Sequence, residues 1–461
     1  MFLQKMLKNK KNGFTLIEMM VFLFIFVVSV LTFYKVFTVG TFAMADARSR
    51  TGGVQLANER IEIIHNLKYE DIGTVGGVVA GDLLQNETVV RSGRTYYAHT
   101  SVMYLDDAFD GTALAGTDTR SSDYKQVKVI VYWENGNLAK STTAVAHISP
   151  PGLEAIYTGG ILSLNVIDSA GIGVPSASIR IINNDISPVV DTTHTTNSSG
   201  NLFLAGAKPA GQTYKLQVSK SGYFAVQTLA PFPTSSFNPI DIHSNVVVAT
   251  INQKTIILDK LANLNIFTKT PAGEVVPSID FALEGGRRIG DTVAIPSMPV
   301  WSLTQANYNS ATTGRVEFLN VSPGSYFLDY LISAQNNNYQ FLYFDVAGAE
   351  ADMFDLAPGT TLNATAIVAD KAVQSLVVTV LNDADSVPIV GASVQLKNAD
   401  ESYKVTLITN KFGKVYFPDS SASLLGGAYR LNVTASGFED VLNKDTMVNK
   451  LTSESVMLIA E

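Results

Sequence analysis

The sequence contains no cysteine among its 461 residues. A chain without cysteine has no disulfide staples, no thiolate metal ligands and no cysteine nucleophile. The lack of cysteine does not determine the cellular compartment, because an exported protein can be stable without disulfides if its domains are large enough. At this length we expect three or four domains.

Charge is also scarce, since only 16% of the residues are charged and the formal net charge is −8. No basic stripe follows the first residues, so a nucleic-acid partner is not expected. Low charge together with 34 glycines and 16 prolines favours β-rich modules of extracellular type over a helical enzyme.

Catalytic and metal motifs are missing as well. The histidines are isolated in sequence and form no H-E-x-x-H or H-x-x-E pattern. They are His65, His99, His147, His194 and His243. No G-x-S-x-G elbow occurs, and "GGRRIG" lacks the helix that follows a phosphate loop, so it predicts a turn. We expect no enzymatic activity and no cofactor other than the calcium considered below.

The N-terminal stretch carries one long apolar run. From Phe14 to Tyr34 the only charged residue is Glu18. About 20 apolar residues, each rising 1.5 Å, cross a bilayer core of roughly 30 Å. The run predicts a transmembrane helix over about 14–37. Lysines precede it at positions 5, 8, 10 and 11, so the N-terminus is expected in the cytoplasm and the rest of this single-pass chain outside.

A cleaved secretory signal is the alternative, because "FAMADA" (Phe42–Ala47) offers small residues at A-x-A spacing. The apolar run is longer than a usual signal core, however. A carboxylate close to hydrocarbon costs about 2.5–3.5 kcal/mol on insertion scales, so Glu18 implies a partner. We therefore favour a retained segment.

The stretch "GFTLIE" at residues 13–18, with lysines upstream and the apolar run downstream, resembles the type IV pilin and pseudopilin family. The resemblance implies that a prepilin peptidase removes the leader 1–13 by cutting between Gly13 and Phe14 and methylates the new N-terminal Phe14. It also implies that Glu18 pairs with the N-terminal amine of a neighbouring subunit. A charge pair in low dielectric would hold the register of apolar helices that otherwise slide.

Apolar residues continue at helical spacing beyond the membrane segment, at Val54, Ala57, Ile61 and Ile64. This spacing predicts a helix from Phe14 to about Leu67, with the glycines at 52 and 53 as a weak point. The resemblance to pilins implies this layout: a long helix whose first half spans the membrane or filament and whose second half packs on a sheet.

Turn signals then predict an antiparallel sheet. Ser92-Gly93 separates two β-prone runs, and Asn135-Gly136 suits a type I′ hairpin turn. With Pro150-Pro151 as a boundary, residues 14–152 are predicted to form one pilin-like domain, a helix plus an antiparallel sheet. Its acidic loop contains Asp106, Asp107 and Asp110, which are candidate calcium ligands; a solvated surface loop is the alternative.

Three weakly similar blocks follow, with predicted bounds 157–258, 260–369 and 370–461. Each begins with an alternating strand and later places a glycine before another strand, where we expect a tight turn with positive φ. These glycines are Gly200, Gly314 and Gly413. The blocks resemble carboxypeptidase-regulatory-like, transthyretin-like domains. The predicted fold is thus an α+β pilin-like domain followed by three tandem all-β sandwiches.

The sequence therefore predicts a minor type IV pilin or pseudopilin subunit that displays β-sandwich domains outside the membrane for adhesion or interaction. Its expected partners are the prepilin peptidase, other pilin subunits, the inner-membrane assembly machinery and the membrane. The alternative is a surface protein that is anchored but does not polymerise and binds a glycan or a protein through its sandwiches.

Overall fold

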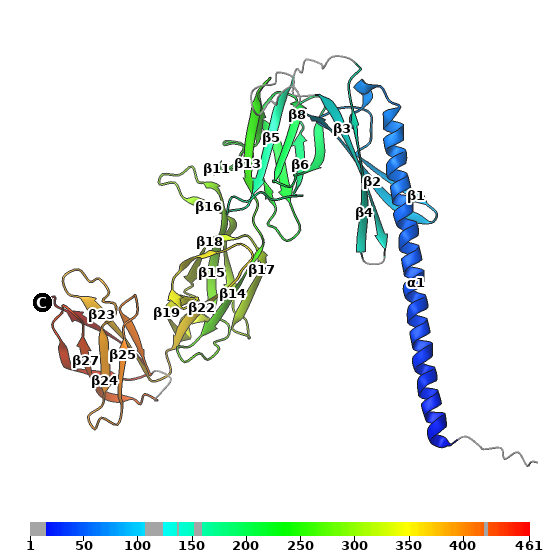
Figure 1. Ribbon diagram of the computed structural model, residues 1–461. Coiled ribbons are helices and arrows are strands. Elements are labelled where there is room, and N and C mark those ends of the chain that lie inside the picture. Colours follow the sequence, from blue (N-terminus) through cyan, green and yellow to red (C-terminus); the bar gives the residue numbers. More distant parts are fainter. Residues whose placement is uncertain (1–14, 107–122, 136–137, 152–158, 419–422) are drawn as a thin grey trace, which may run out of the picture.

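The structure is a computed structural model that describes residues 15–106, 123–135, 138–151, 159–418 and 423–461. One long helix, α1 (Leu16–His65), is followed by a chain of β domains that leads away to one side of the helix axis (Figure 1). With 50 residues, α1 is about 75 Å long. The predicted long helix before a series of sheets is confirmed.

The first sheet is antiparallel and has the order β1-β2-β3-β4. Its strands are β1 (Asn86–Arg91), β2 (Arg94–Leu105), β3 (Tyr124–Asn135) and β4 (Leu138–Ile148), and a short 3-10 turn, η1 (Tyr69–Asp71), precedes them. The turn at Ser92-Gly93 joins β1 to β2, with φ of 50° and 75°. Strands β3 and β4 pair as a hairpin with Asn135 opposite Leu138, and Gly136 of the predicted turn lies outside the described residues.

The second half of α1 packs on β3 and β4. Ala57 and Ile64 are buried as the helical spacing predicts, but Val54 is exposed and Leu56 takes its place in the core. The alternate residues of β3 from Val127 to Trp133 form the opposing face and are at most 2% exposed. Helix and sheet thus share one core.

The glycines at 52 and 53 are close-packing positions within an unbroken helix, and the expected local weakness stays a prediction. A Cβ at Gly53 would lie 2.7 Å from the Trp133 ring, and one at Gly52 would collide with the Tyr96 hydroxyl. That hydroxyl donates to the carbonyl oxygen of Ser49 at 3.1 Å. The missing side chains let two aromatic rings reach the helix backbone.

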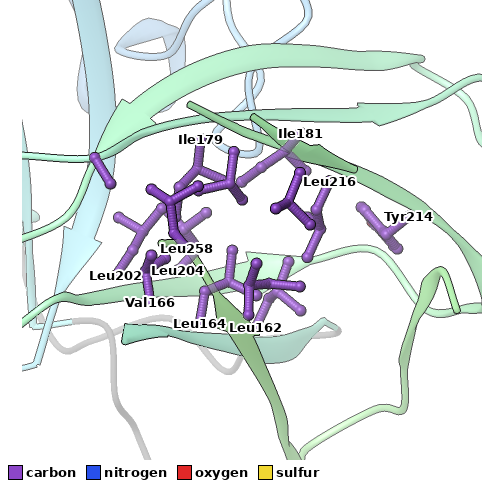
Figure 2. Close-up of a cluster of buried hydrophobic side chains, with 14 of the residues drawn as sticks. Leu162, Leu164, Val166, Ile179, Ile181, Leu202, Leu204, Tyr214, Leu216 and Leu258 are labelled. Atoms are coloured by element: carbon purple, nitrogen blue, oxygen red, sulfur yellow. The ribbon is translucent and has the colours of Figure 1, made fainter. Parts of the chain in front are cut away.

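The first β domain, residues 159–258, has two sheets around one core (Figure 2). Their orders are β10-β9-β6-β7, with β12 beside β9, and β13-β5-β8. The strands are β5 (Gly160–Ile167), β6 (Ser178–Asn183), β7 (Val190–Thr195), β8 (Asn201–Ala207), β9 (Ala210–Ser219), β10 (Val226–Gln227), β12 (Ser244–Val246) and β13 (Ile251–Ile257). Leu164 and Ile179, from opposite sheets, are at most 1% exposed.

The second β domain, residues 262–370, contains the sheets β17-β14-β22-β19-β20 and β11-β15-β18-β21, with β16 beside β15. Its elements are β14 (Ala262–Lys269), β15 (Asp280–Asp291), β16 (Pro299–Asn309), β17 (Arg315–Val321), β18 (Gly324–Tyr330), η3 (Asn336–Asn338), β19 (Tyr339–Val346), β20 (Ala349–Glu350), β21 (Met353–Leu356) and β22 (Thr361–Asp370). Strand β11 (Asn238–Pro239) comes from a loop of the first β domain.

The third β domain, residues 375–458, contains the sheets β26-β23-β29 and β25-β24-β27-β28. Its strands are β23 (Ser375–Asn382), β24 (Ser393–Lys397), β25 (Lys404–Ile408), β26 (Lys414–Phe417), β27 (Gly427–Thr434), β28 (Val441–Val448) and β29 (Leu451–Leu458).

The weak sequence repeat is a repeat of strand pairing. The first strands β5, β14 and β23 each pair in parallel with the last strand of the same domain, β13, β22 or β29. Each also pairs antiparallel with the strand after the predicted glycine turn, β8, β17 or β26. The three glycines have φ of 80°, 59° and 67°, as predicted.

A buried tyrosine also recurs in the three β domains. Its hydroxyl donates to a backbone carbonyl oxygen four to six residues upstream, which ties the start of its strand to the preceding loop. The pairs are Tyr214 with Lys208 at 2.8 Å, Tyr326 with Ser322 at 2.6 Å, and Tyr429 with Leu425 at 3.0 Å. The strand alternation did not single out this hydroxyl contact.

Contacts tie neighbouring domains together. Strand β11 of the first β domain pairs with β15 of the second, and Asp241 accepts from Arg287 at 2.7 Å across the same joint. A small apolar cluster lies between the second and third domains and contains Leu342, Ile367, Ala369 and Val377.

We expect Gly53→Ala to lower the stability of the domain formed by α1 and the first sheet by about 1–3 kcal/mol, because the new methyl group overpacks against Trp133. Gly40→Ala is the matched control, since a Cβ at Gly40 has nothing within 4 Å. The control should be neutral or gain up to about 1 kcal/mol from helix propensity. Thermal unfolding of the full chain in detergent measures both. Equal stability of the two variants would contradict the packing role.

Candidate functional site

The first half of α1 projects from the rest of the chain. It is the one helix in the described part of the chain that is long and apolar enough to cross a membrane, and its most apolar stretch has no buried residue. Phe22, Phe33 and Phe37 are between 65% and 76% exposed. So much bare apolar surface requires cover from outside the chain.

Hydroxyl groups in this half of α1 form their hydrogen bonds within the helix. The hydroxyls of Ser29, Thr32 and Thr38 each donate to the carbonyl oxygen four residues earlier, at 2.7–2.8 Å. Such internal bonds remove the cost of placing a hydroxyl in hydrocarbon. The helix surface is therefore suited to lipid or to other apolar helices.

The start of α1 is capped by Thr15. Its backbone is extended, and its Oγ1 accepts from the Glu18 N–H at 3.2 Å. Thr15 and Glu18 have the T-x-x-E spacing of a capping box, a signal that our sequence reasoning overlooked. The Glu18 side chain is exposed in the first helical turn, where a negative charge also interacts favourably with the helix dipole. Gly13 and Phe14 lie outside the described residues.

The acidic loop is largely beyond the described part of the chain. Asp106 follows the end of β2, whereas Asp107 and Asp110 lie outside the described residues. Within the described ranges, no group of three or more His, Asp or Glu side chains is placed to hold a metal ion. Calcium binding by the loop stays a prediction.

Two histidines that are distant in sequence meet where the first sheet contacts the first β domain. His99 Nε2 donates to the carbonyl oxygen of Thr193 at 3.4 Å. His194 is 4% exposed, its Nε2 lies 3.3 Å from the Thr192 hydroxyl, and its Nδ1 has no hydrogen-bond partner. Neither contact was foreseen from isolated histidines.

The backbone completes this joint. The Asp191 N–H donates to the carbonyl oxygen of Gly76, and the Gln85 side chain donates to the carbonyl oxygen of Asp191, both at 2.7 Å. Met103 of β2 packs against the core of the first β domain. Edge strand β7 is thereby fixed to the domain formed by α1 and the first sheet.

Burial keeps both histidines neutral. Desolvation, together with smaller effects of the nearby His99 and Lys128, lowers the pKa of His194 to about 4. Desolvation also lowers the pKa of His99, against the opposing effect of its bond to Thr193. The joint is therefore built for uncharged imidazoles.

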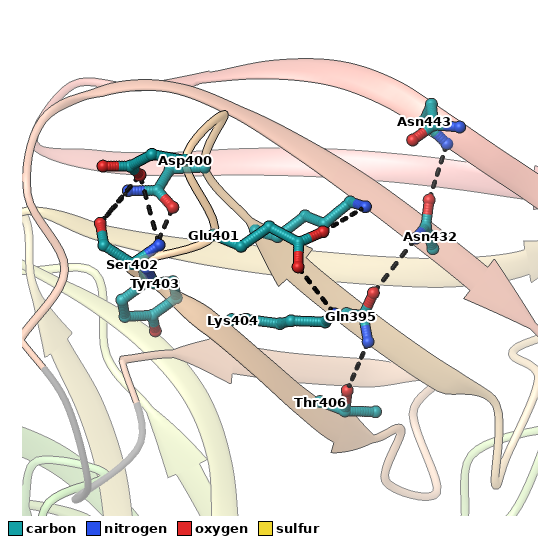
Figure 3. Close-up of polar contacts among 11 residues, drawn as sticks. Gln395, Asp400, Glu401, Ser402, Tyr403, Lys404, Thr406, Asn432 and Asn443 are labelled. Carbon is teal, nitrogen blue, oxygen red and sulfur yellow. Dashed lines mark hydrogen bonds and ion pairs between the residues drawn. The ribbon is translucent and has the colours of Figure 1, made fainter.

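The outer face of the third β domain is polar, and its groups bond to one another (Figure 3). The Gln395 side chain donates to Thr406 and accepts from Asn432, and Asn432 accepts from the N–H of Asn443. Glu401 is paired with two lysines, Lys397 and Lys404, and these bonds lower its pKa. The drawn groups are thus largely engaged within the domain.

We predict that acid weakens the joint through His194. The folded state favours the neutral ring, so its stabilising contribution is present above the ordinary pKa of 6.5 and is lost as the pH falls toward 4. The loss reaches about 3 kcal/mol. His194→Gln should flatten the pH dependence of the thermal midpoint of the full chain in detergent.

Substitution of the exposed His65 by Gln is the matched control and should leave that pH dependence as it is in the wild type. Parallel pH profiles for the wild type and the His194 variant would show that the joint does not depend on a neutral imidazole.

Comparison with known proteins identifies the N-terminal segment. Residues 8–34 match the prokaryotic N-terminal methylation motif. No curated protein matches the chain. The match covers residues 8–13 of the expected leader, the capped start of α1 and most of the apolar run, including Gly13, Phe14 and Glu18.

Solved structures also match at low sequence identity. The Bacillus anthracis TIE protein is 11% identical, with 82% of this chain and 76% of that chain covered and a TM-score of 0.21. A streptococcal ancillary pilin is 10% identical, with 66% and 99% covered and a TM-score of 0.19. BcpA, the major pilin subunit of Bacillus cereus, is 8% identical, with 66% and 100% covered and a TM-score of 0.17. At these scores the likeness says nothing about ligand or assembly.

Proposed function

We propose that this chain is a minor subunit of a type IV pilus or pseudopilus, assembled through the first half of α1 and displaying its β domains outside the membrane. The observation that supports this most is the bare apolar half of α1, most of which lies within the methylation motif match. Before assembly, lipid covers that surface; afterwards, the helices of neighbouring subunits do. The proposed role is assembly and display, with no catalysis.

The proposed topology follows from the charges at the two ends of the apolar run. The four lysines of the leader stay on the cytoplasmic side, and the sheet and β domains lie outside. The inner-membrane assembly machinery would then draw the helix out of the bilayer. Each β domain is proposed to be a separate transthyretin-like sandwich, on the basis of its repeated strand pairing.

The shape of the chain supports sparse incorporation. Because the β domains lead away to one side of α1 (Figure 1), they would collide if every subunit of a tightly packed shaft carried them. We therefore propose a position at the tip, or at rare points along the filament, where the side arm has room.

Processing gives the first test. With prepilin peptidase present, the chain should lose residues 1–13 and gain one methyl group on Phe14. Four lysines leave with the leader, so the formal charge changes from −8 to −12. Mass spectrometry of the intact chain and of its N-terminal peptide measures both. A mature start near Asp46 would show a conventional signal cleavage and refute the proposal.

The assembly role of Glu18 gives the second test. We propose that its carboxylate pairs with the N-terminal amine of a neighbour. Removing one partner of a buried ion pair costs about 3–5 kcal/mol, which corresponds to about a hundredfold to several-thousandfold weaker association. Glu18→Ala should therefore remain in the membrane, still be cleaved, and disappear from sheared filaments.

Two variants separate charge from helix capping. Glu18→Gln keeps a side chain that suits a capping box but loses the charge, so it should fail like the alanine variant. Thr15→Ala removes the observed cap, at a cost of about 1 kcal/mol, and should still enter filaments. Wild-type amounts of Glu18→Ala in filaments would instead favour an anchored surface protein that does not polymerise.

A further inference from the structure

A cleft of about 1190 Å³ opens between the first sheet and the first β domain. One wall is the outer face of β2 and β3, and the other comes from β6, β7 and β8. The two parts lie side by side in Figure 1. The volume exceeds the roughly 300–1,000 Å³ usual for small-molecule sites, so the cleft has room for a chain of small units.

The cleft closes progressively along β2. At its narrow end Met103 packs against the core of the first β domain, and Ser101 is 6% exposed. Next, His99 bonds to Thr193. At the open end, Tyr97 and Tyr132 are directly opposite cross-strand partners and are 50% and 41% exposed. The mouth of the cleft thus presents two adjacent tyrosine rings.

The charged groups of the cleft balance. The lining contains two cations, Lys128 and Arg180, and two anions, Glu87 and Asp191. Arg180 holds Asp191 through two bonds of 2.6 and 2.7 Å, while the histidines of the joint are neutral. A wall without net charge gives no electrostatic advantage to a polyanion or to a cation.

Three of the strands that line the cleft offer a peptide no free edge for strand addition. Strands β2 and β3 lie inside their sheet, so they offer faces and not edges. Strand β7 is an edge, but Gly76, Gln85 and His99 already bond to its backbone at Asp191 and Thr193. Strand addition requires a free edge, and this one is engaged at both residues.

We propose that the cleft binds a neutral oligosaccharide, with sugar rings stacked on Tyr97 and Tyr132 and hydroxyl groups bonded to the Arg180–Asp191 pair and to neighbouring amides. A sugar has an apolar C–H face for the tyrosine rings and a rim of donors and acceptors. The lining offers hydroxyls and amides for that rim, among them Asn86, Gln126 and Thr195. This binding is independent of filament assembly.

The test uses the full processed chain in a detergent without a sugar headgroup. Chitohexaose, cellohexaose and maltohexaose are titrated in turn, with calorimetry as the readout. At least one should bind saturably, and Tyr97→Ala or Tyr132→Ala should weaken it by about tenfold, the loss expected for one stacked ring. Tyr132→Phe keeps the ring and should stay within about threefold of the wild type.

Phe412→Ala is the matched control, because Phe412 is an exposed aromatic residue of the third β domain, 37% exposed and outside the cleft. It should bind as the wild type does. Glu18→Gln should also bind normally while it fails to enter filaments, which separates this site from the assembly proposal.

Two results would contradict the proposal that the cleft binds an oligosaccharide. One is the absence of binding by all three hexasaccharides at concentrations on the order of 10 mM. The other is unchanged affinity in a Tyr97→Ala/Tyr132→Ala double variant that keeps the wild-type thermal midpoint, since the sugar would then bind elsewhere.

Discussion

The packing of α1 against the first sheet is the contact on which the position of all the β domains depends. It requires two glycines that let Tyr96 and Trp133 reach the helix backbone, and it is closed at its edges by ion pairs of Lys140 with Asp46 and of Arg60 with Glu87. Because the bare apolar half belongs to the same helix, the β domains are connected to that half through this core.

The joints between successive domains are held by different kinds of interaction. The first uses backbone bonds and neutral histidines, the second an added strand and the ion pair of Asp241 with Arg287, and the third a small apolar cluster. The direction in which the β domains leave α1 (Figure 1) is thus a property of specific contacts.

Sequence patterning foretold the elements better than the contacts between them. Val127, Val129 and Val131 alternate in the sequence and lie on the buried face of β3, and the turn glycines were predicted from their place before a strand. The same alternation puts Lys125 on that face, where its ammonium donates to the carbonyl oxygens of Tyr69 and Ile72 at 2.6 Å and burial lowers its pKa to about 8. Hydrophobicity alone gives no reason to expect a lysine there.

The joints and the cleft could not be read from the chain, because they depend on residues about a hundred positions apart, such as His99 and Thr193. Gly53 illustrates the same limit. Helix propensity marks glycine as a weakness, whereas its role follows from a ring that arrives from β3. Local sequence signals identify the helix, but only the folded structure shows which side chains pack against it.

The parallel pairing of the first and last strands in each β domain has a mechanical consequence. The chain enters at one end of β5 and leaves at the opposite end of β13, and these strands are in register over seven residue pairs. Tension along the chain would therefore shear the two strands past each other, so that all their hydrogen bonds share the load at once. A hairpin pulled from its open end would instead lose its bonds one by one. The same geometry recurs in β14 with β22, so these domains are suited to bearing force in series.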